Sequence, residues 1–467
     1  MNKSILSLPR AVAVPVAATS LGFAVVQLDV TIVNVALPRI GANLAASVAS
    51  LQWVVDAYTL AFAVLLLSAG ALSDRLGARS AFAAGFAIFG LASLMCGVAP
   101  DAGLLIAARA LQGIGAALLV PSSLALLDAA CHGDAALRAR AVGLWTAAGG
   151  VSIAAGPIAG GALLAWTGWQ AIFLVNVPIC AAGVLLAFRW LPPAPREHAM
   201  RRLDPAGQVL AIVALTAFVG SIIEAPSPLV DGHIVVLGFI AAALAAIAFC
   251  GVEAHMRAPM LPPALFRLPG FAATLLFGVA VNLTYYGIVF VLSLYLQHAL
   301  GYSASEAGLA YLPLTGTFVV SNVASAAVAA RWSSRVAMVA GALVGAAGFA
   351  LLAGLDSASS YVAMLPAFAL IPLGMGLAVP AMTTVMLSSA TRQTAGTASG
   401  ALNTARQVGG AVGVALFGAR VGAGGERIVA GLHETAWLSA LVLVLAAIVA
   451  WYGVRQRAKR APAAALA

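Results

Sequence analysis

Charged residues are scarce in this sequence. Of its 467 residues, 63% are hydrophobic and only 8% are charged, and the mean hydropathy is +1.04. Soluble domains contain about 25% charged residues. The composition therefore excludes a soluble globular protein and predicts a chain that crosses a membrane many times.

Several chemical signatures are also missing. The four cysteines are scattered and form no CxxC pair, and the six histidines show no metal spacing. No GxxxxGKS or GxxxxGKT phosphate loop occurs, and no cluster of ionisable groups suits an enzyme. We therefore expect no metal, no cofactor and no ATP hydrolysis by that route, and we predict that the protein is not an enzyme.

Long apolar segments are abundant, and each bilayer crossing needs about 20 residues. We count fourteen segments, at residues 11–37, 52–73, 81–99, 102–127, 141–164, 169–190, 206–225, 233–252, 271–296, 306–329, 336–354, 361–386, 396–419 and 434–453. Polar stretches divide them into an N-terminal six-helix bundle (1–190), two inserted helices between cytoplasmic linkers (191–269), and a C-terminal six-helix bundle with a basic tail (270–467). Two helical halves around a central site are typical of transporters.

The basic residues predict the orientation. If each segment crosses once, 19 of the 24 basic residues lie on the side of the N-terminus. Arg39, Arg420 and Arg427 lie on the other side, and Arg109 and Arg406 lie within segments. This positive-inside bias places both termini in the cytoplasm. The net charge of +9 then reflects topology, and no loop has room for a nucleic-acid-binding domain.

Two acids lie within the apolar segments. Asp29 belongs to the stretch LDVTIVNVALPRI and lies about 8 residues, or ~12 Å, from the outer end of its segment. A charge at such depth costs about 2.5–3.5 kcal/mol, which proton binding or a basic partner would lower. We predict a proton site at Asp29, with a purely structural ion pair as the alternative. Asp56, about 4 residues from the outer end of the next segment, is the second candidate, or merely favours the positive end of its helix.

The segment 102–127 carries a basic residue at the depth of Asp29. Arg109, Gln112, Gly113 and Ala116 share one helical face. An arginine in a membrane needs an acidic or carbonyl partner. We therefore expect Arg109 to take part in proton coupling, with a structural role as the alternative.

The loop after the second segment reads GALSDRLGAR and contains three charges, Asp74, Arg75 and Arg79. Asp74 is placed to meet the positive end of the helix predicted at 396–419. Arg75 or Arg79 is expected to pair with Asp128. This network would hold an inner gate shut, although an ordinary positive-inside loop would look similar.

Small residues recur along the segment 141–164. They are Gly143, Ser152, Gly156, Gly160 and Gly161, with Pro157 among them. A stripe of small residues permits close helix contact, and Pro157 permits a kink. Ordinary helix packing would also account for this pattern.

These motifs carry a family resemblance that covers essentially the whole chain. The loop resembles the G-x-L-x-D-R-x-G-R-R signature of the major facilitator superfamily, with Ala78 in place of a basic residue. The Arg109 region resembles its R-x-x-Q-G-x-G-A motif, which is associated with proton transfer. The segment 141–164 resembles its antiporter signature, with Ser152 in place of glycine, and the stretch around Asp29 resembles the first-helix motif of the fourteen-helix drug/proton antiporters.

Candidate residues for the substrate cavity come from three segments. Gln112 lies beside Arg109, and the second half contributes Asn282, Tyr285, Tyr286, Asn403, Arg406 and Gln407. Aromatic faces near a carboxylate suit lipophilic cations. Packing explains the aromatic residues equally well.

The resemblance implies an all-α major facilitator fold with two six-helix bundles, two extra central helices and both termini inside. It also implies a proton-coupled antiporter of the bacterial inner membrane that exports lipophilic, cationic drugs or antiseptics by alternating access. Protons, a small-molecule substrate and membrane lipid are the partners, without nucleic acid; a periplasmic adaptor is left open. A dedicated exporter of one endogenous metabolite or antibiotic is the alternative, and a channel is a third possibility.

Overall fold

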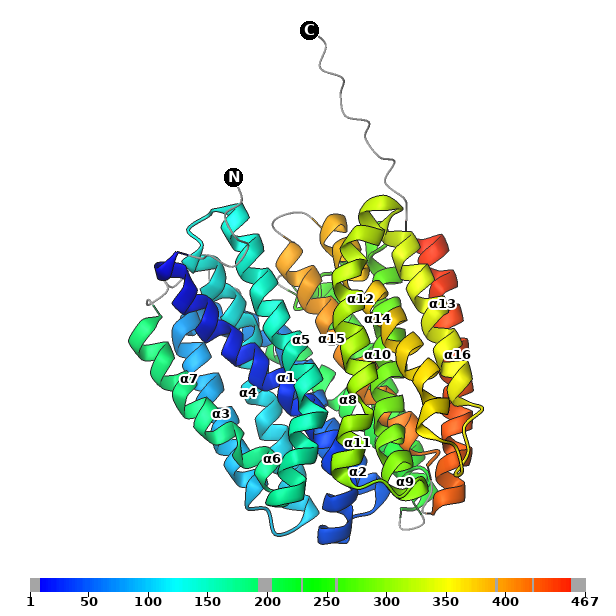
Figure 1. Cartoon of the computed structure of the whole chain (residues 1–467). Coiled ribbons are helices and arrows are strands. Elements are labelled where there is room, and N and C mark those ends of the chain that lie inside the picture. Colours follow the sequence, from blue (N-terminus) through cyan, green and yellow to red (C-terminus); the bar gives the residue numbers. More distant parts are fainter. Residues whose placement is uncertain are drawn as a thin grey trace.

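The computed structural model describes residues 9–191, 204–227, 230–256, 259–390, 394–421 and 424–454. Within these residues the chain forms helices and no strand, which confirms the predicted all-α class. Most of the long helices stand side by side, as Figure 1 shows. Most of the first predicted linker, part of the second and the basic tail lie outside the described residues.

A first group of helices forms the left side of the molecule in Figure 1. It consists of α1 (Arg10–Leu44), α2 (Val48–Leu76), α3 (Ala78–Gly97), α4 (Ala102–Ala130), α5 (Ala135–Trp166), α6 (Ala171–Leu174) and α7 (Asn176–Trp190). Helix α4 packs against α2 and α3, and α1 packs against α5. Glycines permit the closest approaches: Gly113 of α4 lies against the Tyr58 carbonyl of α2, where a side chain would clash.

A last group forms the right side. It consists of η1 (Pro263–Arg267), α10 (Phe271–Leu294), η2 (Tyr295–Ala299), α11 (Ala304–Ala310), α12 (Leu312–Arg331), α13 (Ser334–Leu352), α14 (Tyr361–Ser389), α15 (Ala395–Gly418) and α16 (Gly425–Gly453). Helices α10 and α15 approach closely because Gly409 and Gly413 lie against the Val279 and Leu283 carbonyls.

Between the two groups lies a hairpin of α8 (Pro205–Glu224) and α9 (Gly232–His255). The amide of Gln208 donates to the Val64 carbonyl of α2 at 2.8 Å, and the indole of Trp53 donates to Glu224 at 3.0 Å. Helix α8 is thus attached to α2 near both of its ends, and it also contacts α15. Helix α9 exposes large apolar side chains such as Leu237 and Ile247, as expected of a surface in contact with lipid.

Within the described residues, twelve helices are long and apolar enough to cross a membrane. Fourteen were expected. The segments predicted at 306–329 and 396–419 are helical, as α11 with α12 and as α15, but they are not among the twelve. Helix α12 includes side chains outside the described set, and α15 carries Asn403, Arg406 and Gln407 near its middle, which lower its hydropathy.

The two groups meet closely at one end. The end of the molecule where α1 begins and α16 ends, at the top of Figure 1, is called the terminal end. The opposite end is called the distal end. At the distal end Gln52 of α2 donates to the Val414 and Ala415 carbonyls of α15, at 3.1 and 2.7 Å. A residue of the last group also donates to the first group: Gln297 of η2 donates to the Val35 carbonyl of α1 at 3.0 Å.

Helices α5 and α11 close the same end. The hydroxyl of Ser305 donates to the Gly161 carbonyl at 3.0 Å. Gly308 lies against the Pro157 carbonyl, and Gly161 against the Ala304 carbonyl, so that neither position has room for a side chain. The structure therefore represents a state closed at the distal end.

Replacing Gln52 by alanine should open the distal end more often. Two hydrogen bonds between α2 and α15 are lost, each worth about 0.5–1.5 kcal/mol, so the population open at this end should rise several-fold. The measurement is maleimide labelling from the distal side of a cysteine at Thr59, with the four native cysteines replaced by alanine. Gln170→Ala, at an exposed distal glutamine, is the control. Equal labelling of the two variants would contradict the prediction.

Candidate functional site

The predicted partnership of Asp29 and Arg109 is present. Asp29 in the middle of α1 and Arg109 in α4 are 0% and 1% exposed. Nη1 of Arg109 lies 2.5 Å from Oδ2 of Asp29. Burial in a low-dielectric interior makes each of these charges costly alone, so each stabilises the other.

Amide side chains complete the surroundings of the carboxylate. Gln112, one turn from Arg109, donates to Asp29 Oδ1 at 2.9 Å and to the Ser93 hydroxyl at 2.8 Å, and its carbonyl accepts from Arg109 at 2.6 Å. Asn176, at the start of α7, donates to the same Oδ1 at 3.1 Å. We predicted Gln112 as a cavity residue but did not identify Asn176 or Ser93. A polar residue in the apolar segment 169–190 was the available signal for Asn176.

Arg109 has further partners on α2 and α6. Its Nε donates to the Val54 carbonyl at 3.0 Å, and its guanidinium carbon lies 4.4 Å from the centre of the Tyr58 ring and 5.7 Å from that of Phe173. These contacts connect the ion pair to the position of α2. A change in charge at Asp29 is therefore felt by a helix that also contacts α15 of the other group.

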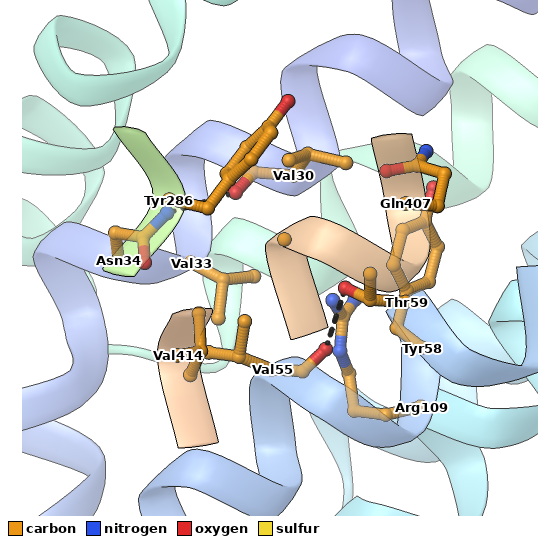
Figure 2. Close-up of a pocket in the computed structure, with 11 residues that line it drawn as sticks. Val30, Val33, Asn34, Val55, Tyr58, Thr59, Arg109, Tyr286, Gln407 and Val414 are labelled. Atoms are coloured by element: carbon orange, nitrogen blue, oxygen red, sulfur yellow. Dashed lines mark hydrogen bonds between the residues drawn. The ribbon is translucent and has the colours of Figure 1, made fainter. Parts of the chain in front are cut away.

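A cavity borders the ion pair. It is lined by α1, α2 and α4 of the first group and by α10 and α15 of the last, through Val30, Val33, Asn34, Val55, Tyr58, Thr59, Arg109, Tyr286, Gln407, Gly410 and Val414 (Figure 2). Its volume of about 20 Å³ accommodates about one water molecule, whereas drug-sized ligands need several hundred Å³. A second cavity of similar size lies beside it, and Asn34 and Tyr286 border both.

Of the predicted cavity residues, Tyr286 and Gln407 line the first cavity, and Tyr285 and Tyr286 line the second. The Tyr285 and Tyr286 rings lie edge to face, with centres 5.5 Å apart. Nε of Arg406 donates to Oδ1 of Asn282 at 3.3 Å, so these two join α15 to α10. Asn403 is partly exposed on α15 but borders neither cavity.

Asp56 is placed differently from Asp29. It is fully buried, and both of its carboxyl oxygens are without a hydrogen-bond partner among the described residues. It shares a face of α2 with Trp53 and Leu60, which pack with α8 and α15. Asp56 therefore lies where α2, α8 and α15 meet.

The predicted inner-gate residues lie at the terminal end. Asp128 pairs with Arg138 at 2.5 Å, across the turn between α4 and α5, and both side chains are more than half exposed. Arg79 donates to the Leu191 carbonyl at 3.3 Å and lies over the Phe188 ring. Arg75 or Arg79 was expected to pair with Asp128; in this state Asp128 pairs with Arg138, and Arg79 binds the Leu191 carbonyl instead. Asp74 and Arg75 lie in the last turn of α2, which is also at the terminal end.

The stripe of small residues on α5 packs against α1. Gly156 lies against the Thr31 side chain and Gly160 against Ile32, in the turn of α1 that follows Asp29. Gly161 instead contacts α11 of the other group. Ser152 is half-buried, and Gly143, nearer the terminal end, has open space around its Cα. Pro157 borders the second cavity.

The site defines a class of protein. An ion pair buried in membrane-spanning helices, beside a cavity between two helix groups, is the arrangement of a membrane transporter. Within the described residues no cluster of histidine, cysteine and acidic side chains could hold a metal ion. Residues 19–414 match the sequence family of the Major Facilitator Superfamily. The chain therefore belongs to this superfamily.

Similar proteins are bacterial resistance proteins. The methylenomycin A resistance protein of Bacillus subtilis (strain 168) is 39% identical over 400 residues, which cover 85% of each chain. The puromycin resistance protein pur8 of Streptomyces alboniger is 38% identical over 466 residues, covering 93% of this chain and 90% of the relative. The multidrug resistance protein Stp of Mycobacterium tuberculosis (strain CDC 1551 / Oshkosh) is 34% identical over 401 residues, covering 86% and 74%. The chain is thus a multi-pass plasma-membrane protein, and these relatives point to a transporter rather than an enzyme.

The buried pair predicts an asymmetric effect on stability. Asp29→Asn leaves a guanidinium that cannot lose its proton, whereas Arg109→Gln leaves a carboxylate that can take one up. We expect Asp29→Asn to lower the melting temperature more, through a loss of about 3–5 kcal/mol, and the double variant to recover part of it. Thermal unfolding of the detergent-solubilised protein measures this. Equal and additive losses would contradict it.

Proposed function

We propose that this protein exports drug-like molecules in exchange for protons, by alternating access between the two helix groups. The observation that carries the proposal is the fully buried Asp29–Arg109 pair at the edge of a cavity between those groups. Apolar side chains of similar volume could replace a buried ion pair without loss of stability, so the presence of the pair indicates a functional role. Relatives named for drug resistance support the substrate class.

Proton coupling would work through the partners of Asp29. In this state the carboxylate accepts hydrogen bonds from Arg109, Gln112 and Asn176. A proton on Asp29 would weaken the bond to Arg109 and allow the guanidinium to move towards the cavity. Because Arg109 also holds the Val54 carbonyl, α2 would move with it. The proposal needs no cofactor, since the proton gradient supplies the driving force.

We also propose fourteen spans, in a six, two and six arrangement. Support comes from helix direction in the last group. Tyr295 at the end of α10 donates to the Asp356 carbonyl, and His433 near the start of α16 contacts the Leu355 carbonyl, in the loop between α13 and α14. Helices α10 and α13 therefore both end distally, and α14 and α16 both begin there. The chain must return to the terminal end through α12 and cross again through α15.

The terminal end is proposed to face the cytoplasm. Arg75, Arg79, Arg138, Arg189 and Arg335 lie at this end, in keeping with the positive-inside rule. The state closed at the distal end would then be closed to the outside. Asp74 and Asp128 remain our candidates, with Arg75 and Arg79, for a gate at the cytoplasmic end.

Asp56 is our candidate for a second proton site. A charge on its carboxyl group would be buried without a partner at the junction of α2, α8 and α15, so this state favours the protonated acid. Movement between the groups would change that environment, because α2 and α15 belong to different groups. Asp29 charged and Asp56 neutral would describe one stage of the cycle.

A dedicated exporter of one compound is the second candidate. Two of the relatives are each named for a single antibiotic, whereas a third is named for multidrug resistance. Susceptibility of expressing cells to a panel of unrelated dyes, antiseptics and antibiotics separates the two. Protection against one compound only would favour the dedicated exporter.

Asp29→Asn should abolish export against a gradient, because the variant side chain cannot carry a proton. Downhill movement of the drug can continue. The measurement is drug accumulation in energised proteoliposomes at matched protein content, with Asp101→Asn, at an exposed helix cap, as the control. Uphill export by the Asp29 variant at the rate of the control would refute the proton site.

Asp56→Asn should remove one charge from each transport cycle. One elementary charge is worth ~2.3 kcal/mol per 100 mV, or about a 50-fold change in accumulation. In proteoliposomes with a potassium-set potential and no pH difference, the accumulation ratio of the variant should depend less steeply on voltage than that of wild type. This expectation holds for an anionic, a neutral or a monovalent cationic substrate. Identical voltage dependence would return Asp56 to a structural role.

A further inference from the structure

Arg406 is a second arginine within a helix of the central region, and its surroundings differ from those of Arg109. It lies near the middle of α15, which packs against α2, α8, α10 and α14 and so faces protein rather than lipid. Its side chain is nevertheless partly exposed, unlike that of Arg109. Because the helices packed around α15 belong to both groups, we take this exposed surface to open between them.

The guanidinium group of Arg406 has few protein partners. Its stem packs against Gly278, and Nε donates to Asn282 at 3.3 Å. Arg406 has no ion pair with a described residue, in contrast to Arg109, Arg138 and Arg420. Most of its five N–H donors are therefore free to bind a ligand.

No acid in the last group can neutralise this charge. The described acidic residues of the last group all lie at the distal end: Glu306 caps α11, Asp356 is in the loop between α13 and α14, and Glu426 and Glu434 are on the distal part of α16. In the first group, Asp29 is already paired, and Asp56 faces α8 with Trp53 and Leu60. The space between the groups thus has a net positive wall.

The residues next to Arg406 connect it to the cavity. The Tyr286 side chain lies close enough to Arg406 to interact with it electrostatically, and it borders both cavities. Gln407 lines the first cavity. In Figure 2 Tyr286 lies near Val30, and Gln407 lies near Tyr58 and Thr59; the apolar side chains of Val33 and Val414 line the same cavity. A ligand with an apolar body and one anionic group would match this combination of surfaces.

We propose that the transported drug carries a carboxylate and that Arg406 binds it. The guanidinium fork matches the two oxygens of a carboxylate, whereas a lipophilic cation would be repelled. This inference rests on the proposed export function and replaces cations with weak organic acids as the substrate class. Because the cavity is now too small for a drug, binding requires the groups to separate at the terminal end.

The test compares three probes on the full-length protein in nanodiscs, by calorimetry without any proton gradient. They are 1-naphthoate, its neutral amide 1-naphthamide, and the cation tetraphenylphosphonium. Wild type should bind the carboxylate at least about tenfold more tightly than the amide, as expected for charge-assisted hydrogen bonds. Arg406→Gln should lose this preference while its affinity for the amide is unchanged.

Arg406→Lys is the second variant and should keep part of the preference, because the charge remains but the fork is lost. Arg420→Gln, at the exposed distal end, is the matched control and should behave as wild type. Equal binding of carboxylate and amide by wild type, preference for the cation, or an undiminished preference in Arg406→Gln would overturn the inference. Loss of proton-driven export with the carboxylate preference intact would remove the proposed function and leave this binding site standing.

Discussion

The buried ion pair of Asp29 and Arg109 is the interaction on which the rest of the site depends. Each charge alone would be costly in an apolar interior, and together they still need partners for their remaining oxygens and N–H groups. Gln112, Asn176 and the Val54 carbonyl supply these partners from three different helices. The positions of α1, α2, α4 and α7 are thereby linked to the charge state of one carboxyl group.

The two arginines in the middle of the helices, Arg109 and Arg406, have opposite surroundings. Arg109 is neutralised by Asp29, so the wall formed by the first group carries no net charge there. Arg406 has no anion among the described residues, so the wall formed by the last group is positive.

The depth of a charge along its segment was the most informative feature of the sequence. Equal depth predicted that Asp29 and Arg109 meet, and they do. The stripe of small residues on α5 was predicted to make a close contact, and Gly156 and Gly160 lie against α1. Asn176 and Ser93 were missed because a single amide or hydroxyl in an apolar helix does not specify the residue that it faces. Arg75 or Arg79 was expected to pair with Asp128, yet that carboxylate pairs with Arg138, which is closer to it along the chain than either.

The sequence alone determined the all-helical class and the positions of the apolar helices. In a bilayer each segment must satisfy its own backbone hydrogen bonds, so these features are local and can be read from composition. Only the tertiary structure decided that the distal end is closed, that Asp56 has no hydrogen-bond partner among the described residues and that Arg406 pairs with Asn282 and with no described acid. These features depend on how helices rotate and tilt against each other, and they join residues as far apart as Gln52 and Ala415, 363 positions along the chain. No local pattern encodes such contacts, because many rotations of the same apolar helix bury it equally well.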